Sequence, residues 1–186
     1  MMRQWPINQA ARVLREGGVI AYATESVFGL GCDPFNPVAV HRLLQIKQRP
    51  ESKGLILIAA DVEQFSGLLA PLGEGSAELI SQHWPGPTTL VLPVTDQVPD
   101  WISGQFETVA MRVSDHPQVQ ALCSRFGGPI VSTSANFSGH PPARSATQVQ
   151  RSLGPVLDYV LPGEVGGLQN PTQIIDAVSG QLLRAG

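Results

Sequence analysis

Charge and cysteine are scarce in this sequence, and long apolar runs are missing. Charged residues make up 15% of the 186 positions, against roughly a quarter in an average soluble domain, whereas apolar residues make up 42%. Disordered chains combine low hydrophobicity with high charge, so this composition excludes disorder. No apolar run reaches the roughly 20 residues that a membrane-spanning helix needs, and residues 1–6 hold no apolar signal core. We therefore expect a cytoplasmic protein with no membrane contact.

The familiar catalytic and metal-binding motifs are missing as well. Cys32 and Cys123 have neither a Cys-x-x-Cys partner nor a histidine at ligand spacing, so we expect buried thiols and no zinc site. The sequence has no Walker A motif, no Gly-x-Ser-x-Gly elbow and no complete dinucleotide fingerprint. Its four histidines show no metal-ligand spacing. Phosphate chemistry would therefore have to use cationic side chains and loop amides.

Positive charge gathers in the first third of the chain. The net charge of −3 argues against a strong general nucleic-acid binder, yet residues 1–60 carry a balance of +3 and the rest carries −6. The chain has only two lysines, Lys47 and Lys53, and Arg49 lies between them. These three cations can surround a polyphosphate. The alternative is a solvated helix end whose cations offset the helix dipole.

Extended and helical patterns alternate along the chain. Helices are expected to begin near Asn8, Asn36, Asp61 and Asp115, where capping residues precede apolar residues at helical spacing. Strands are expected over residues 19–23, 55–59, 88–92, 108–113, 130–133, 173–178 and 181–184, the last two as a hairpin. This alternation predicts an α/β fold with a single open, twisted, mixed β-sheet and helices on its faces, formed as one domain over residues 1–186.

Polar loops follow two of the predicted strands. Thr24 comes directly after strand 19–23, and Ser134 and Asn136 come directly after strand 130–133. Loops at strand ends hold ligands in many α/β sheets, and the second loop has the composition of an anion-binding nest. Ordinary turns and helix caps are the alternative for both loops.

Arg112 lies inside an apolar strand, over residues 108–113. An unpaired buried charge is costly, and no acidic residue is an obvious partner in the sequence, so a ligand anion is the expected partner. Arg144, Thr172 and Arg184 lie in polar segments and, taken singly, are expected at the surface.

Taken together, these segments resemble the YrdC/TsaC family, whose members act as threonylcarbamoyl-AMP synthases. The family's Tyr-Pro-Thr-Glu/Asp-Thr loop is similar to residues 22–26, its Lys-x-Arg-Pro motif to residues 47–50, and its Ser-x-Asn motif to residues 134–136. The resemblance covers about Asn8 to Arg184. Ala23 replaces the family's usual proline, and Ile58 stands where some longer, two-domain members place a polar residue.

The resemblance implies a YrdC-like fold and a nucleotidyltransferase. Such an enzyme joins L-threonine, bicarbonate or carbon dioxide, and ATP into threonylcarbamoyl-adenylate and pyrophosphate, for threonylcarbamoyl modification of tRNA adenosine. Lys47 and Arg49 would be catalytic, with Lys47 steadying the carboxylating group. ATP would be held by Arg49, Lys53, Arg112, Ser134, Asn136, Arg144 and Arg184, and threonine by Thr24, His116 and Thr172. Mg²⁺ would arrive on the ATP phosphates, since no carboxylate cage for a metal is visible.

Two other functions compete with this one. The first is a non-catalytic module that grips structured RNA with the cations around Arg49, which would make its affinity strongly salt-dependent. The second is adenylation of another carbamoyl group, as in the YrdC-like segment of hydrogenase maturation proteins, although that segment normally sits in a much longer chain. The resemblance also implies transfer of the product to a tRNA threonylcarbamoyl transferase complex, and leaves open whether this chain makes a weak tRNA contact of its own.

Overall fold

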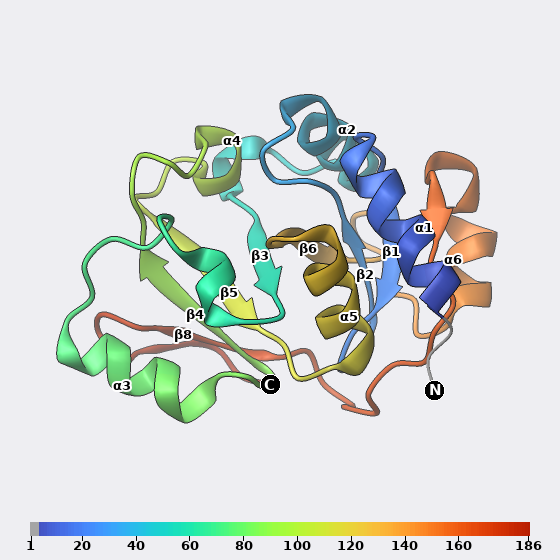
Figure 1. The fold of residues 1–186 in the computed structure, drawn as a ribbon. Helices are drawn as coiled ribbons and strands as arrows, with labels where there is room; N and C mark the ends of the chain where they lie inside the picture. The colour runs from blue at the N-terminus through green and yellow to red at the C-terminus, as the bar shows by residue number, and fades with distance from the viewer. Residues whose placement is uncertain (1–3) are drawn as a thin grey trace.

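One mixed β-sheet of nine strands runs through residues 4–186, the part of the chain that the computed structural model describes (Figure 1). The strands are β1 (Ile20–Ala23), β2 (Phe28–Gly31), β3 (Ile56–Ala59), β4 (Thr88–Pro93), β5 (Thr108–Val113), β6 (Ile130–Ser134), β7 (Tyr159–Val160), β8 (Gln173–Asp176) and β9 (Leu182–Arg184). Their order is β7-β1-β2-β6-β3-β5-β4-β8-β9, which leaves the sheet open at both ends. Three of the pairs are parallel, namely β1/β7, β3/β5 and β4/β8. The predicted open mixed sheet is confirmed. The prediction that residues 1–6 hold no signal core falls partly on residues 1–3, which lie outside the described residues.

Helices pack on the faces of this sheet. They are α1 (Gln4–Arg15), α2 (Pro37–Lys47), α3 (Glu74–His83), α4 (Asp100–Ser103), α5 (Pro117–Phe126) and α6 (Ala146–Ser152), with the 3-10 turns η1 (Glu51–Lys53), η2 (Val62–Phe65) and η3 (Gly154–Val156). The side chain of Asn36 caps α2 by accepting hydrogen bonds from the amides of Val38 and Ala39, as its place before a proline predicts. No helix within the described residues is long and apolar enough to cross a membrane.

Two of the predicted helix starts are wrong. Helix α1 already begins at Gln4, so Asn8 lies inside it; Pro6 falls in the first turn, where an amide needs no helical acceptor. Asp61 does cap a turn, by accepting from the amide of Glu63, but this turn is the short 3-10 segment η2 and not an α-helix. Helix α3 was not predicted, because Ser76 is its only buried residue and no apolar stripe marks it in the sequence.

Strand β2 was not predicted from the sequence, because two of its four residues, Gly29 and Gly31, are of a type common in loops. A side chain at Gly31 would put its Cβ 2.6 Å from the carbonyl oxygen of Val131 and 2.8 Å from the ring of Tyr22. Glycine is therefore needed there for β2 to lie between β1 and β6, and it does not mark a turn. The turn itself is confined to the residues between β1 and β2, beginning with Thr24.

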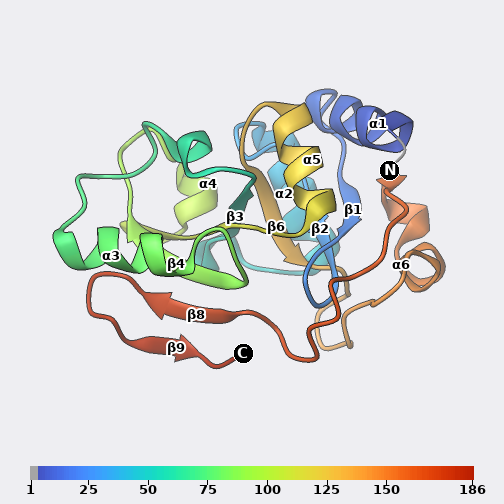
Figure 2. The same cartoon turned by 60° about the horizontal axis from the view of Figure 1, so that its bottom comes forward.

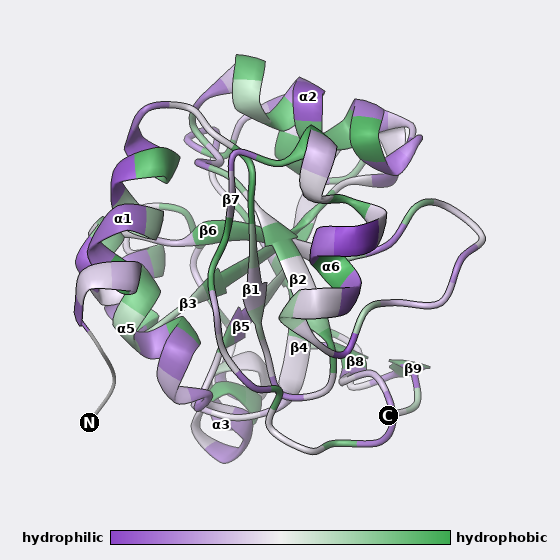
Figure 3. Ribbon diagram, turned by 90° about the vertical axis from the view of Figure 1, so that its right-hand side faces the viewer, coloured by the Kyte–Doolittle hydropathy of each residue, from purple (hydrophilic) through white to green (hydrophobic). Residues whose placement is uncertain are grey.

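The alternation of side chains along β3 separates two cores on opposite faces of the sheet. Leu57 packs in one cluster with Val40 and Leu43 of α2. Ile58 packs in the other, with side chains of α1 and α5. Figure 3 shows β3 and β6 in the green of apolar residues between these layers. Cys32 and Cys123 are buried free thiols, as predicted, and burial raises the pKa of both.

The C-terminal hairpin extends the sheet on the side away from α1. Strand β8 pairs with β4, and β9 pairs with β8, so the hairpin predicted from the sequence is confirmed (Figure 2). Arg112 lies opposite Ile58 in the parallel β3/β5 pair and points to the same face as Ile58. Helices α1 and α5 cover only part of this face. The rest of it is open, and the candidate site lies there.

Candidate functional site

A cavity of about 670 Å³ lies over the middle of the sheet. Its floor contains Ser132, Ile56, Ala110 and Val91, which lie side by side in register on β6, β3, β5 and β4. The short side chains of Ala110 and Ser132 leave room above the strands. The walls come from the β1–β2 turn, the η1 turn before β3, the segment before β5, and the C-terminal hairpin.

Seven of the residues predicted from the sequence line this cavity. They are Thr24, Arg49, Lys53, Arg112, Ser134, Thr172 and Arg184. Four of the seven are cations, and they come from three separate parts of the chain. The other four predicted residues, Lys47, Asn136, His116 and Arg144, are not among its lining residues. The expectation that Arg144, Thr172 and Arg184 lie at the surface is wrong for Thr172, which is buried, and holds for Arg144 and Arg184, which are exposed.

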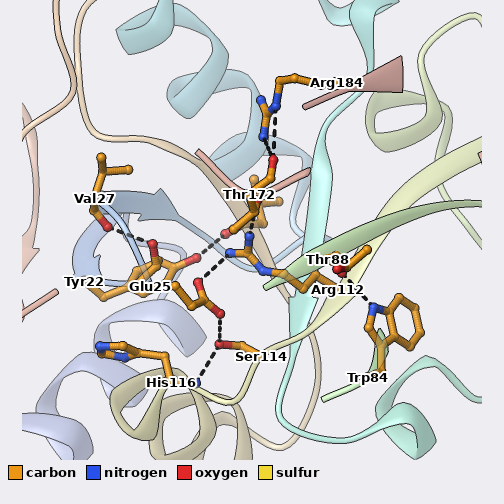
Figure 4. A network of polar contacts seen from close by, with 12 residues as sticks. Tyr22, Glu25, Val27, Trp84, Thr88, Arg112, Ser114, His116, Thr172 and Arg184 are labelled. Atoms are coloured by element: carbon orange, nitrogen blue, oxygen red, sulfur yellow. Dashed lines mark hydrogen bonds and ion pairs between the residues drawn. The ribbon is translucent and has the colours of Figure 1, made fainter. Parts of the chain in front are cut away.

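Arg112 has an internal partner that the sequence did not reveal. Its Nη2 lies 3.2 Å from Oε2 of Glu25, and both side chains are almost fully buried. The other carboxylate oxygen of Glu25 accepts a 2.5 Å hydrogen bond from the hydroxyl of Ser114. The expectation of a ligand anion as the partner of Arg112 is therefore corrected, because the turn after β1 brings Glu25 beside β5 (Figure 4).

Thr172 joins Arg112 to Arg184. Its hydroxyl oxygen accepts a 2.7 Å hydrogen bond from Nη1 of Arg112, and its carbonyl accepts bonds from Nε and Nη2 of Arg184, at 3.2 and 2.6 Å (Figure 4). Burial lowers the pKa of Arg184, and so does the nearby charge of Arg112. Two like charges held this close on one wall favour the binding of an anion with several charges.

Arg49, which lies shortly before the η1 turn, and Lys53, its last residue, line the same cavity. Nε and Nη2 of Arg49 donate to the carbonyl of Gly54 at 3.1 and 2.9 Å, and Nη2 also donates to the carbonyl of Lys53 at 3.2 Å. Burial lowers the pKa of Arg49. These bonds fix the direction of the guanidinium, while Lys53 is exposed.

Comparison with known proteins places this chain in a family. The profile of the Sua5/YciO/YrdC domain, described as "Telomere recombination", matches residues 12–186. The chain belongs to this family. A threonylcarbamoyl-AMP synthase of Halorhodospira halophila is 53% identical over 182 residues, which is 98% of this chain and 95% of that protein. A protein of the same name from Pseudomonas entomophila is 48% identical over the full length of both.

The structure of P. abyssi Sua5 in complex with L-threonine is similar to this chain, with a TM-score of 0.92 and 34% identity. The match covers 99% of this chain and 55% of that protein, so this family member spans about half the length of the Sua5 chain.

In this Sua5/YciO/YrdC member, Lys47 lies behind the cavity wall. Its side chain is buried, and its Nζ contacts the carbonyl oxygens of Ser134 and Asn136 at 2.6 and 2.7 Å. Burial and the charge of Arg49 lower the pKa of Lys47 to about 8. The loop that was predicted as an anion nest thus turns two of its carbonyls toward a lysine of its own chain.

His116 and Arg144 contact the segment that leads from β7 to β8. Nε2 of His116 lies 3.1 Å from the carbonyl oxygen of Glu164, which makes Nε2 the protonated nitrogen, and a guanidinium nitrogen of Arg144 donates to the carbonyl of Gln169. The same segment is bound to the turn after β1, since the amide of Gly166 donates to the carbonyl of Thr24 at 3.0 Å. His116 and Arg144 therefore hold the segment that delivers Thr172 to the cavity.

Three features of this cavity were not predicted from the sequence. Glu25 pairs with Arg112, Ser114 donates to Glu25, and the cavity lining includes the large apolar side chains of Phe106 and Leu183. Glu25 could have been noticed, because it follows Thr24 directly and is the only acidic residue in that loop. Among residues 4–186, no group of three or more His, Cys, Asp or Glu residues could hold a metal ion.

Proposed function

We propose that this chain is a threonylcarbamoyl-AMP synthase built as a single YrdC-like domain. The amine of L-threonine combines with carbon dioxide, from bicarbonate, to give a carbamate. A carbamate oxygen then attacks the α-phosphorus of ATP, and pyrophosphate leaves. The observation that carries this proposal is that one cavity is lined by four cations, Arg49, Lys53, Arg112 and Arg184. The hydroxyl-bearing side chains of Thr24 and Thr172 line the same cavity. It is supported by relatives of this name that match over nearly the whole chain.

The chemistry needs these cations. A carbamate and a triphosphate are both anions and repel each other, so positive charge must neutralise them and align the attack. We assign the phosphates to Arg49, Lys53 and Arg184, with Arg112 between them and the carbamate. Ser134 would complete the nucleotide site, and Asn136 and Arg144 would support it from behind. Mg²⁺ would enter with the ATP phosphates, which supply most of its ligands.

Threonine would lie against Thr24 and Thr172. The hydroxyl of Thr24 donates to the carbonyl of Val27 at 2.8 Å, so its lone pairs remain able to accept from a substrate. The hydroxyl of Thr172 accepts from Arg112, so its proton remains able to donate. His116 would act by holding the β7–β8 segment in place.

We predict the order threonine, then serine, then valine for the amino-acid substrate. Valine has nearly the shape of threonine but leaves the bonding groups of Thr24 and Thr172 unpaired, which costs about 1–3 kcal/mol. Serine keeps the hydroxyl and loses one methyl group, at about 0.8 kcal/mol. The measurement is product formation from labelled bicarbonate with each amino acid at matched concentration. Equal rates with valine and threonine would refute the threonine assignment.

We assign the adenine base to the part of the cavity that Phe106 and Leu183 line. Their side chains are 49% and 52% exposed, although they are large and apolar. They come from different elements, the segment before β5 and the edge strand β9. A nucleobase has an apolar face that can stack on such side chains.

We predict that Phe106→Ala raises KM for ATP by about five- to thirty-fold, corresponding to the loss of roughly 1–2 kcal/mol of stacking. KM for threonine should stay unchanged, and Phe106→Tyr should keep a low KM for ATP. The control is Phe35→Ala, which removes an equally exposed phenylalanine outside the cavity. If both alanine variants behave like the wild type in steady-state kinetics, the base does not bind in this part of the cavity.

One assay distinguishes threonylcarbamoyl-AMP synthesis from the adenylation of another carbamoyl group. The purified protein should release pyrophosphate from ATP when threonine and bicarbonate are present, and should not do so with carbamoyl phosphate alone. Release with carbamoyl phosphate and not with threonine would assign it to the rival class. No pyrophosphate with either substrate, together with salt-dependent RNA binding, would favour the RNA-binding module.

The proposed product is an activated adenylate, which must be passed to a second catalyst. A tRNA threonylcarbamoyl transferase complex would use it on tRNA adenosine, and a weak contact of this chain with tRNA would serve that transfer. We place the reaction in the cytoplasm, where ATP, threonine and tRNA are all present.

A further inference from the structure

Lys47 is the last residue of α2, and its ammonium group is fully bonded within the protein. Nζ lies 2.6 Å from the carbonyl oxygen of Ser134, 2.7 Å from that of Asn136 and 2.7 Å from Oδ1 of Asn136. The hydroxyl oxygen of Ser134 is a fourth neighbour at 3.4 Å. An ammonium group has three protons, and these oxygens use all of them. The residue is 7% exposed and does not line the cavity, so its ammonium group has no proton available to bind a substrate.

The loop that Lys47 binds also has bonds of its own, since the amide of Asn136 donates to the carbonyl of Ser134 at 3.0 Å. The hydroxyl of Ser134 donates to Oδ1 of Asn136 at 2.6 Å, and Nδ2 of Asn136 donates to the carbonyl of His140 at 2.5 Å. The carbonyl oxygens of Ser134 and Asn136 both point at Nζ of Lys47. Their partial negative charges repel each other, and the positive ammonium group between them attracts both. Loss of Lys47 would leave the carbonyl of Asn136 without this donor, and the carbonyl of Ser134 with the amide of Asn136 alone.

The loop in turn places a residue on the cavity wall. Ser134 ends β6 in register with Gly29 of β2, and it is the one member of this cluster that lines the cavity. Its position therefore depends on Lys47 from behind and on β2 from the side.

We propose that Lys47 is a positioning residue, which fixes the Ser134–Asn136 loop against the nucleotide and does not touch threonine, bicarbonate or ATP. This inference rests on the proposed function. It replaces the role in the carboxylating step that the family resemblance implied for Lys47.

The two lysines of the chain allow a direct test on the unaltered protein. Reductive methylation with formaldehyde and cyanoborohydride, followed by peptide mass spectrometry, reports the accessibility of Lys47 and Lys53 separately. Lys53, which is exposed, should be methylated in the free protein and protected by ATP. Lys47 should stay unmodified with and without threonine, bicarbonate and ATP. Methylation of Lys47 in the free protein would overturn the proposal, whether or not the substrates protect it. Failure of ATP to protect Lys53 would instead count against the proposed ATP site.

A double-mutant cycle separates positioning from contact. Lys47→Met should raise KM for ATP about ten-fold or more, through the displaced loop, and leave KM for bicarbonate within about two-fold of the wild type. Adding Ser134→Ala to Lys47→Met should cost less than three-fold more, because the displaced loop already moves the hydroxyl of Ser134 away from the nucleotide. A selective rise in KM for bicarbonate, or effects of the two changes that multiply, would show that Lys47 acts on the substrate itself.

Discussion

Arg112→Met is expected to lower the free energy of unfolding by about 3–5 kcal/mol and to abolish pyrophosphate release. The change leaves the carboxylate of Glu25 buried without its ion-pair partner, and an uncompensated buried charge costs this much. It also frees the hydroxyl of Thr172, which Arg112 holds at 2.7 Å. Urea unfolding and the pyrophosphate assay measure the two effects.

A second substitution distinguishes stability from function. Arg112→Met combined with Glu25→Gln removes both charges, and the amide can still bond to Ser114, so most of the lost stability should return. Activity should not return, because the cavity still lacks the cation. The control Arg151→Met, on the exposed side of α6, should change stability by no more than about 0.5 kcal/mol. A double variant with normal activity, or a stable Arg112→Met variant, would contradict this account of Arg112.

Arg49→Ala is expected to remove most of the activity while the protein remains folded. The lost group is a charge-assisted contact to phosphate, worth roughly 1.5–3 kcal/mol, which corresponds to about a ten- to hundred-fold lower kcat/KM for ATP. The cost in stability should be about 1 kcal/mol, because the guanidinium also donates to the carbonyls of Lys53 and Gly54.

Arg49→Lys provides the matched variant for this position. Lysine keeps the charge but lacks the planar fork that binds both the turn and a phosphate, so an intermediate activity is expected. Arg42→Ala, which removes a half-exposed ion pair with Asp158 on the surface, should have almost no effect on activity. An Arg49→Ala protein that releases pyrophosphate at close to the normal rate would show that this guanidinium does not bind the nucleotide.

The sheet could be predicted from the sequence where apolar residues run without interruption. The run from Leu55 to Ala59 identified β3, because a strand with helices on both faces needs apolar side chains on both faces. Strand β2 escaped notice, because Gly29 and Gly31 resemble turn residues in a sequence. At Gly31 the requirement for glycine is steric, and it is visible only once Tyr22 and Val131 lie against this residue.

The candidate site could also be predicted only in part. Arg49 and Ser134, which belong to family motifs, and Lys53 line the same cavity, since each lies next to a predicted strand. Which cations face the ligand could not be predicted. Lys47 and Arg49 are two residues apart, yet one is bonded behind the wall and the other lines the cavity. That difference depends on the direction of each side chain at the end of α2, which no motif specifies.

The central claim is that ATP and threonine meet in this cavity. A crystal structure of the protein with L-threonine and an ATP analogue that cannot be cleaved at the α-phosphate tests it most directly. The account predicts the triphosphate against Arg49, Lys53 and Arg184, the base at Phe106 and Leu183, and threonine beside Thr24 and Thr172. A nucleotide bound elsewhere on the protein, with this cavity empty at saturating ligand, would contradict it.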